Sequence, residues 1–160
     1  MSDAYEQPLQ SKVRLVMEAM GRSLAIYQQI ELLLKLLLPH LVGPHQDAGD
    51  IFADWKSLLN SKTTLGPLVA CLDKSVLSTD PKGFSHYLTE VVKNRNELVH
   101  HFYELPFSRL SNIQECDDAL VYLDVRFRLA LTLHQVTREI EGLSLALEKS
   151  IVEDGATDSH

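Results

Sequence analysis

Cysteine, basic charge and long apolar runs are all scarce in this chain, and each shortage limits what the protein can be. Its 160 residues include two cysteines, Cys71 and Cys116, which lie neither in a Cys-x-x-Cys pair nor at a metal-ligand spacing. They predict reduced thiols in a cytoplasmic protein. Acidic residues outnumber basic ones by 22 to 15, so the net charge is −7, which argues against a broad basic surface for nucleic acid. Any contact with nucleic acid must be local, which favours a small active site over an extended groove.

Charge also breaks the longest apolar run. This run extends from Ile30 to Leu38, but Glu31 and Lys35 interrupt it and Pro39 follows it. It is far shorter than the ~20 apolar residues that cross a bilayer, so it predicts a buried helix rather than a membrane anchor. The first ten residues are polar and acidic and lack the basic and apolar regions of a secretion signal, which again predicts a cytoplasmic protein.

Helical periodicity dominates what is present. The hydrophobic content of 45% is enough for the core of one domain, and no segment alternates with the period of two that strands require. The sequence predicts an all-α bundle of four to five helices with long first and last helices, at about residues 10–38, 50–59, 65–77, 81–105 and 111–151. The first and last helices are expected to pack antiparallel. We expect a single domain over residues 1–152 and a disordered C-terminal tail over 153–160.

Prolines and polar capping residues mark the predicted helix ends. Pro39 is expected to end the first helix, and Pro106 to end the helix that begins near Pro81. Ser111 and Gln114 fit a capping box at the start of the last helix. Further candidates for an N-cap are Asp50, Thr63 and Thr64.

An arginine interrupts the apolar side of the helix predicted over residues 81–105. With about 100° of rotation per residue, Arg95 falls in the middle of a stripe that otherwise contains Leu88, Val91, Val92, Val99 and Phe102. Arginine is costly in such a place unless an anion meets it.

Polar side chains gather on the flank beside that arginine. The same rotation brings together Thr89, Asn96, His100 and Tyr103, whereas His101 projects to the opposite flank with Asn94. Arg95 is permanently cationic, and His100 titrates near neutrality. Together with the Asn96 amide, these groups suit a phosphate.

This segment reads Arg95-Asn96-Glu97-Leu98-Val99-His100 and resembles the R-x4-6-H motif of the HEPN superfamily. Members of that superfamily are all-α domains that carry the motif near the end of a helix. The size of the chain, its helical pattern, the long helix after the motif and the stretch at residues 64–68 are also similar to members of this family.

The resemblance implies a metal-independent endoribonuclease (RNase) that acts as a homodimer, with the motifs of two copies forming one active site. The 2′-hydroxyl of the RNA substrate would be the nucleophile, and the products would carry a 2′,3′-cyclic phosphate and a 5′-hydroxyl. In this reading Arg95 stabilises the phosphate, His100 transfers protons, and Asn96 orients His100 or the phosphate. No cofactor is expected.

Many family members are the toxin of a toxin-antitoxin or phage-defence module, so the resemblance also implies a nucleotidyltransferase antitoxin as a partner. In some modules the antitoxin modifies a tyrosine in an R-x4-H-x-Y pattern. Here Phe102 stands at that place, and Tyr103 fits the spacing only if His101 is the motif histidine. His101 and Tyr103 are therefore secondary candidates.

Each of these residues also has a purely structural interpretation. An arginine and a histidine on one helix can form a structural hydrogen-bond network, His101 can be a bystander, and Tyr103 can be an aromatic at the edge of the core. Four loop residues, His40, His45, Asp47 and Asp50, match no established ligand pattern, so no metal site is predicted. The alternative function is a non-catalytic HEPN-like protein that uses the same surface to dimerise or to bind a nucleotide or a protein.

Overall fold

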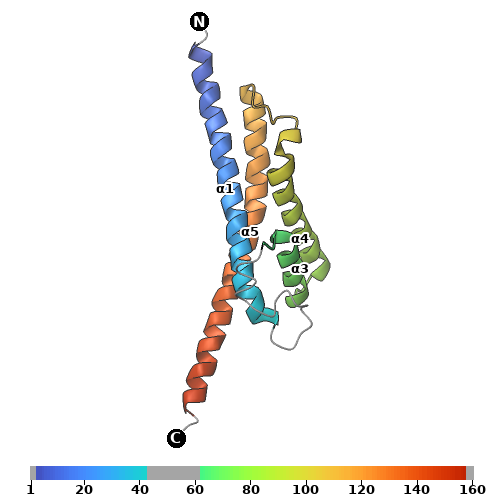
Figure 1. Ribbon diagram of the computed structural model, residues 1–160, viewed down its shortest axis with the longest axis vertical. Coiled ribbons are helices and arrows are strands. Elements are labelled where there is room, and N and C mark those ends of the chain that lie inside the picture. Colours follow the sequence, from blue (N-terminus) through green and yellow to red (C-terminus); the bar gives the residue numbers. More distant parts are fainter. Residues whose placement is uncertain (1–2, 43–61, 158–160) are drawn as a thin grey trace. The chain divides into compact units, whose positions relative to one another are not determined.

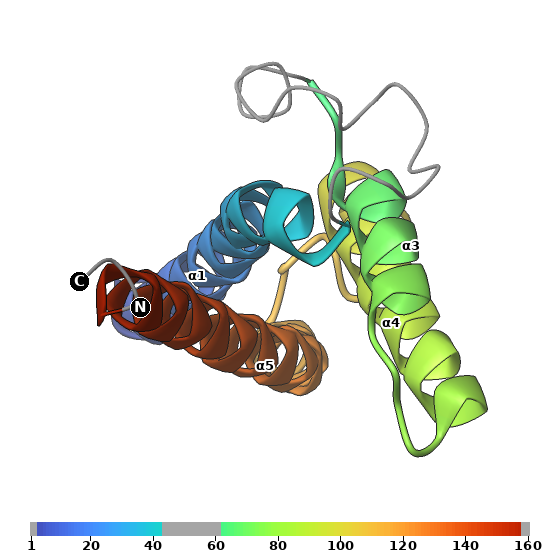
Figure 2. The same ribbon diagram turned by 90° about the horizontal axis from the view of Figure 1, so that it is seen from below.

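The computed structural model describes residues 3–42 and 62–157, and it describes side chains for residues 7–41 and 62–146. The helix predicted over residues 50–59 lies outside the described residues. The described elements, in chain order, are α1 (Asp3–Val42), α3 (Leu65–Ser75), α4 (Pro81–Asn96), the short turns η2 (Glu97–His101) and η3 (Phe102–Glu104), and α5 (Ile113–Thr157). These residues contain no strand in either view of the ribbon, which confirms the predicted all-α class with long first and last helices (Figure 1, Figure 2).

The chain divides into two compact units that share the two long helices. The first unit comprises Met1–Gln29 and Ser78–Thr132, and the second comprises Ile30–Leu77 and Leu133–His160. The motif segment, α4, η2 and η3 therefore belong to the first unit together with the first parts of α1 and α5.

In the first unit α1 and α5 run parallel, so the predicted antiparallel packing is wrong. Lys12 forms an ion pair with Asp117, and the Arg22 guanidinium lies 4.6 Å from the centre of the Phe127 ring. Contacts that advance along both helices together define a parallel pair, and Figure 1 shows the blue part of α1 and the orange part of α5 pointing the same way. The intervening helix α4 runs opposite to α1 and brings the chain back beside the first part of α1, where α5 begins. The apolar patterns of α1 and α5 do not contain this information about direction.

Pro39 does not end α1, contrary to expectation. The helix begins earlier than predicted, at Asp3, and continues through Pro39 to Val42. Proline removes one backbone hydrogen bond and usually bends or breaks a helix, but burial can outweigh that cost. Leu37 and Leu38 next to it are 1% and 0% exposed, so the turn around Pro39 is held by its packing.

The second unit is built around leucines from α1, α3 and α5. The buried side chains include Leu34, Leu65, Leu68, Leu72 and Leu133. Thr64 is the N-cap residue of α3, but its side chain makes no capping hydrogen bond. Instead, the Leu65 backbone N–H donates to Glu31 Oε1 at 3.2 Å, so a carboxylate from α1 caps the helix.

The start of α4 agrees with the sequence. Asp80 is the N-cap residue and its Oδ1 accepts a hydrogen bond from the Gly83 N–H at 3.0 Å, while Pro81 occupies the first turn. At the other end the helical path stops at Glu104, and Leu105 is extended before Pro106, as the residue before a proline prefers.

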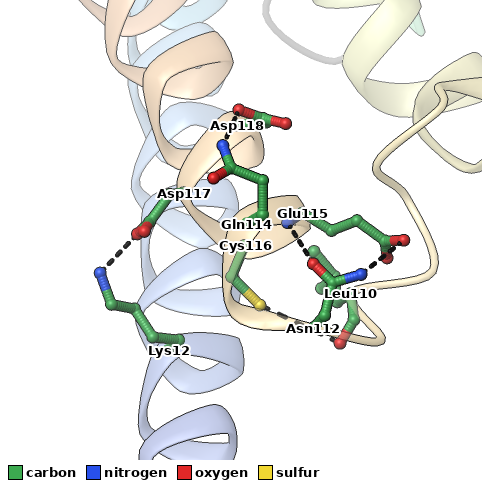
Figure 3. Close-up of polar contacts among 8 residues, drawn as sticks. All are labelled: Lys12, Leu110, Asn112, Gln114, Glu115, Cys116, Asp117 and Asp118. Atoms are coloured by element: carbon green, nitrogen blue, oxygen red, sulfur yellow. Dashed lines mark hydrogen bonds and ion pairs between the residues drawn. The ribbon is translucent and has the colours of Figure 1, made fainter.

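The start of α5 uses a different capping pair from the one predicted. The Glu115 N–H donates to Asn112 Oδ1 at 2.9 Å, and Asn112 Nδ2 donates to Glu115 Oε1 at 3.1 Å (Figure 3). Ser111 also donates to the Glu115 carboxylate, whereas Gln114 bonds Asp118. The capping box is thus shifted by one residue, because the chain turns at Leu110, whose φ is +52°.

The far end of α5 extends to Thr157 and so enters the segment that the sequence predicts to be a disordered tail. Cys71 and Cys116 are both free thiols. Among the helices of the described residues, none is long and apolar enough to cross a membrane.

Candidate functional site

The motif segment begins on α4 and continues through a change of helix type. Arg95 and Asn96 are the last residues of α4, and Glu97–His101 forms a turn of π-helix, followed by the 3₁₀ turn Phe102–Glu104. π-turns are rare and are frequently found at functional sites. Because a π-turn holds more residues than an α-turn, the uniform α-helical rotation that placed His100 and His101 on opposite flanks does not apply across this segment.

Burial shows that the core face of this segment is offset from the predicted stripe. Asn94 and Leu98 are 8% and 5% exposed, whereas Val99 is 41% exposed and Arg95 is half-buried. Arg95 therefore lies at the boundary of the core, and Asn94 occupies the buried position. This correction reduces the cost of placing Arg95 there, because its charged end can remain in contact with water.

Arg95 and Asn96 are brought together as expected. Arg95 Nη1 donates a hydrogen bond to Asn96 Oδ1 at 3.2 Å, and Asn96 is exposed. The amide oxygen thus fixes one edge of the guanidinium. The Asn96 amide nitrogen is a donor, so the pair presents cationic and neutral donors at the end of α4.

The two histidines are both exposed and lie side by side. The His100 and His101 ring centres are 6.3 Å apart in an edge-on arrangement. His101 Nδ1 and Glu104 Oε1 are 3.0 Å apart and share a hydrogen bond, which becomes an ion pair when the imidazole is protonated. His101 therefore has a carboxylate partner in the 3₁₀ turn that follows it, which the sequence did not predict.

Tyr103 is an exposed side chain rather than a core-edge aromatic. It is 77% exposed, and its ring meets the buried Phe102 edge-on with ring centres 5.9 Å apart. The hydroxyl end of Tyr103 is therefore accessible from solvent.

Sequence reasoning missed a group of residues that contact one another at the start of the π-turn. Glu97 Oε2 accepts hydrogen bonds from Arg126 Nη2 and from the Tyr122 hydroxyl, both at 3.0 Å. The Arg126 guanidinium also lies over the Tyr122 ring, 3.3 Å from its centre. We call these three residues the Glu97 cluster. The only sequence signal was a charged residue, Arg126, on the inner half of an otherwise amphipathic helix.

The Glu97 cluster changes the acid-base properties of its members. The hydrogen bond from Arg126 is the main cause that lowers the pKa of the Glu97 carboxyl below its ordinary value. Burial, followed by the hydrogen bond to Glu97, raises the pKa of Tyr122 to about 12. Glu97 is therefore anionic and Tyr122 neutral around neutral pH, which is the pairing that their hydrogen bond requires.

No metal cluster is formed in the described part of the chain, since no three His, Cys, Asp or Glu side chains converge there. His45, Asp47 and Asp50 lie outside the described residues. Comparison of the chain with protein-family models, curated proteins and solved structures finds no match. The residues of the segment itself are therefore what a functional assignment must rest on.

Proposed function

We propose that this protein is an endoribonuclease of the HEPN type, and that it cleaves RNA by attack of the substrate's own 2′-hydroxyl. One observation carries the proposal: the hydrogen-bonded pair Arg95 and Asn96 precedes a π-turn that presents two exposed histidines. A cationic fork, an amide and imidazoles on one short segment supply what this reaction needs from a protein.

Each residue has a defined task in this reaction. Arg95 binds the scissile phosphate and stabilises the extra negative charge of the transition state, because a guanidinium donates two parallel hydrogen bonds to a phosphate. His100 accepts the 2′-hydroxyl proton or donates a proton to the leaving 5′-oxygen. Asn96 holds the guanidinium through its oxygen, and His101 and Tyr103 are secondary contacts for the RNA.

The direction of the Glu97 side chain supports this assignment. A carboxylate within the motif would repel a phosphate if it faced the same side as Arg95. Glu97 instead bonds Arg126 and Tyr122 on α5, where its charge is compensated. The motif can thus contain an acidic residue without placing an uncompensated negative charge at the phosphate.

The proposed active enzyme is a homodimer. One motif supplies one Arg95 and one His100, whereas the reaction needs a proton acceptor, a proton donor and phosphate contacts on both sides of the phosphorus. Two facing motifs would supply them. The exposed apolar side chains of Val99 and Tyr103 on the same segment are suited to a protein contact. In the toxin-antitoxin form of this proposal, a nucleotidyltransferase antitoxin is the controlling partner.

Controlled expression in bacterial cells tests the proposal. We would express wild type, His100→Ala and His86→Ala from a tight promoter at equal protein levels, and follow growth and total RNA integrity. His86 is an exposed histidine on the same helix and serves as the matched control. We expect wild type and His86→Ala to slow growth and degrade RNA, and His100→Ala to do neither. Equal growth with intact RNA in all three would contradict a toxic ribonuclease.

A second candidate is a non-catalytic HEPN-like protein that uses this surface to bind another protein or a nucleotide. The net charge of −7 and the exposed Val99 favour it, because an acidic protein attracts RNA poorly and an exposed apolar side chain favours a protein contact. Dimerisation without RNA cleavage by purified protein would select this candidate.

A further inference from the structure

The π-turn at Glu97–His101 is not required by its local sequence. Residues 84–105 contain neither glycine nor proline, so nothing in this stretch prevents an ordinary α-helix from continuing. π-turns nevertheless remain rare in proteins. A contact from elsewhere in the fold must therefore favour the π-turn over the α-helical alternative.

The Glu97 cluster supplies such a contact at the first residue of the turn. The carboxylate receives two hydrogen bonds from α5, one of them from a cation. Its side chain and that of Arg126 are 28% and 24% exposed, so water competes only partly for these bonds. Charge-assisted hydrogen bonds that are shielded in this way are the stronger kind, and they fix the position of the backbone that carries them.

Two core side chains, one in the π-turn and one directly after it, anchor the rest of this segment. Leu98 and Phe102 are 5% and 2% exposed, while the residues between them, Val99, His100 and His101, are exposed. Leucine and phenylalanine pack without strict directional demands, so they could stay buried in either an α-turn or a π-turn. A carboxylate that accepts hydrogen bonds from two fixed donors can do so in only one of these geometries. Glu97 is thus the member of the turn whose geometry defines its register.

The surroundings of Arg126 show how closely this cluster depends on Glu97. Among the described residues, Arg126 Nε and the Tyr27 hydroxyl are buried without a hydrogen-bond partner. Burial raises the pKa of Tyr27 to about 12, so this hydroxyl stays neutral and adds no second anion for Arg126. Glu97 is the anion that compensates the half-buried Arg126 guanidinium, and Arg126 in turn holds the Glu97 side chain.

We propose that Glu97 is a positioning residue: bonded to Arg126 and Tyr122, it keeps residues 97–101 in the π-turn and thereby sets where His100 and His101 emerge relative to Arg95. An α-helical turn would rotate the histidines by about 100° for each residue of phase that is gained. The effect of Glu97 on the π-turn depends on the fold alone, whereas its effect on RNA cleavage rests on the proposed function.

Nuclear magnetic resonance of the full chain tests the turn without reference to activity. The variants are Glu97→Gln, which keeps the shape but removes the charge, and Tyr122→Phe, which removes one of the two donors and keeps the ring beneath Arg126. Glu90→Gln on the same helix is the control, since Glu90 pairs with Lys93 at the surface. We would measure amide exchange of residues 97–102 and the titration of the His100 and His101 rings.

In Glu97→Gln we expect amide exchange in the turn to accelerate about tenfold, and the titration midpoints of His100 and His101 to move relative to each other. Tyr122→Phe should give a smaller change in the same direction, and Glu90→Gln none. Circular dichroism confirms that each variant is folded. If folded Glu97→Gln and Tyr122→Phe show the same amide exchange and histidine titrations as wild type, the proposal is overturned.

RNA cleavage provides the second readout. If wild type cleaves RNA, Glu97→Gln should lower kcat by about tenfold or more with a smaller change in KM, because His100 is misplaced while Arg95 still binds the phosphate. A wild type that fails to cleave RNA contradicts the proposed function and leaves the resonance result to decide the role of Glu97. An active Glu97→Gln with unchanged kcat would overturn its role in positioning.

Discussion

The contact between Glu97 and Arg126 should be worth considerably more than a surface ion pair at the same distance. Its donor and acceptor are 3.0 Å apart, and the two side chains are 28% and 24% exposed. At this separation and an effective dielectric constant of about 20, the Coulomb energy is about 5.5 kcal/mol. Desolvation of both groups offsets much of it, so a net contribution of about 2 kcal/mol is expected, within the range for hydrogen bonds to charged groups.

A double-mutant cycle measures this contribution directly. Glu97→Gln, Arg126→Met and the double variant are compared with wild type by urea denaturation at about pH 7, and the departure from additivity gives the coupling energy. Asp124 and Arg128 on α5 provide the control, since they lie 2.9 Å apart but are 48% and 76% exposed. Their coupling energy should be about 0.5 kcal/mol.

Acidification should abolish the coupling in a definite range. Because the pKa of Glu97 is lower in the folded protein than its unfolded value of about 4.3, its stabilisation is complete above that value. It is then lost as the pH falls through the folded pKa. A coupling energy below about 0.5 kcal/mol at neutral pH, or one that is the same at about pH 3 as at about pH 7, would show that this ion pair does not stabilise the fold as described.

Three further predictions concern the fold and the assembly. Leu98→Ala should lower the free energy of unfolding by about 2–4 kcal/mol and Val99→Ala by less than about 1 kcal/mol, because Leu98 is buried and Val99 is exposed. Equal losses in urea denaturation would show that Leu98 does not belong to the core. Asn112→Ala should lower the free energy of unfolding by about 1 kcal/mol and Gln114→Ala by only a few tenths, because Asn112 caps α5. The reverse order in thermal unfolding would support the capping box of Ser111 and Gln114 instead. Light scattering at micromolar concentration should give twice the 18.0 kDa chain mass, and a strictly monomeric protein would contradict the composite active site.

Local chemistry made the class and several helix ends predictable. Asp80 before Pro81 marks the start of α4, and Pro106 marks the limit of the helical path, because both effects act within one turn of the chain. The start of α5 was misplaced by one residue. Ser111 and Asn112 are both good capping residues, and the choice between them depends on the backbone turn at Leu110 rather than on composition.

Features that depend on contacts between distant segments could not be read from the pattern. The parallel packing of α1 with α5 follows from the path of the chain through α4. The π-turn has no sequence signal of its own, and we attribute it to the contact of Glu97 with Arg126 on α5. The predicted stripe also placed Arg95 and Val99 too deep in the core, whereas the structure buries Asn94 and Leu98 instead.

The proposed ribonuclease activity can be tested by incubating purified protein with a synthetic RNA and with DNA of the same sequence, in the presence of a metal chelator. We expect wild type to cleave only the RNA and to leave 2′,3′-cyclic phosphate and 5′-hydroxyl ends, and Arg95→Ala and His100→Ala not to cleave it. Intact RNA with folded, dimeric wild type would contradict the proposed activity, as would cleavage that persists in both variants.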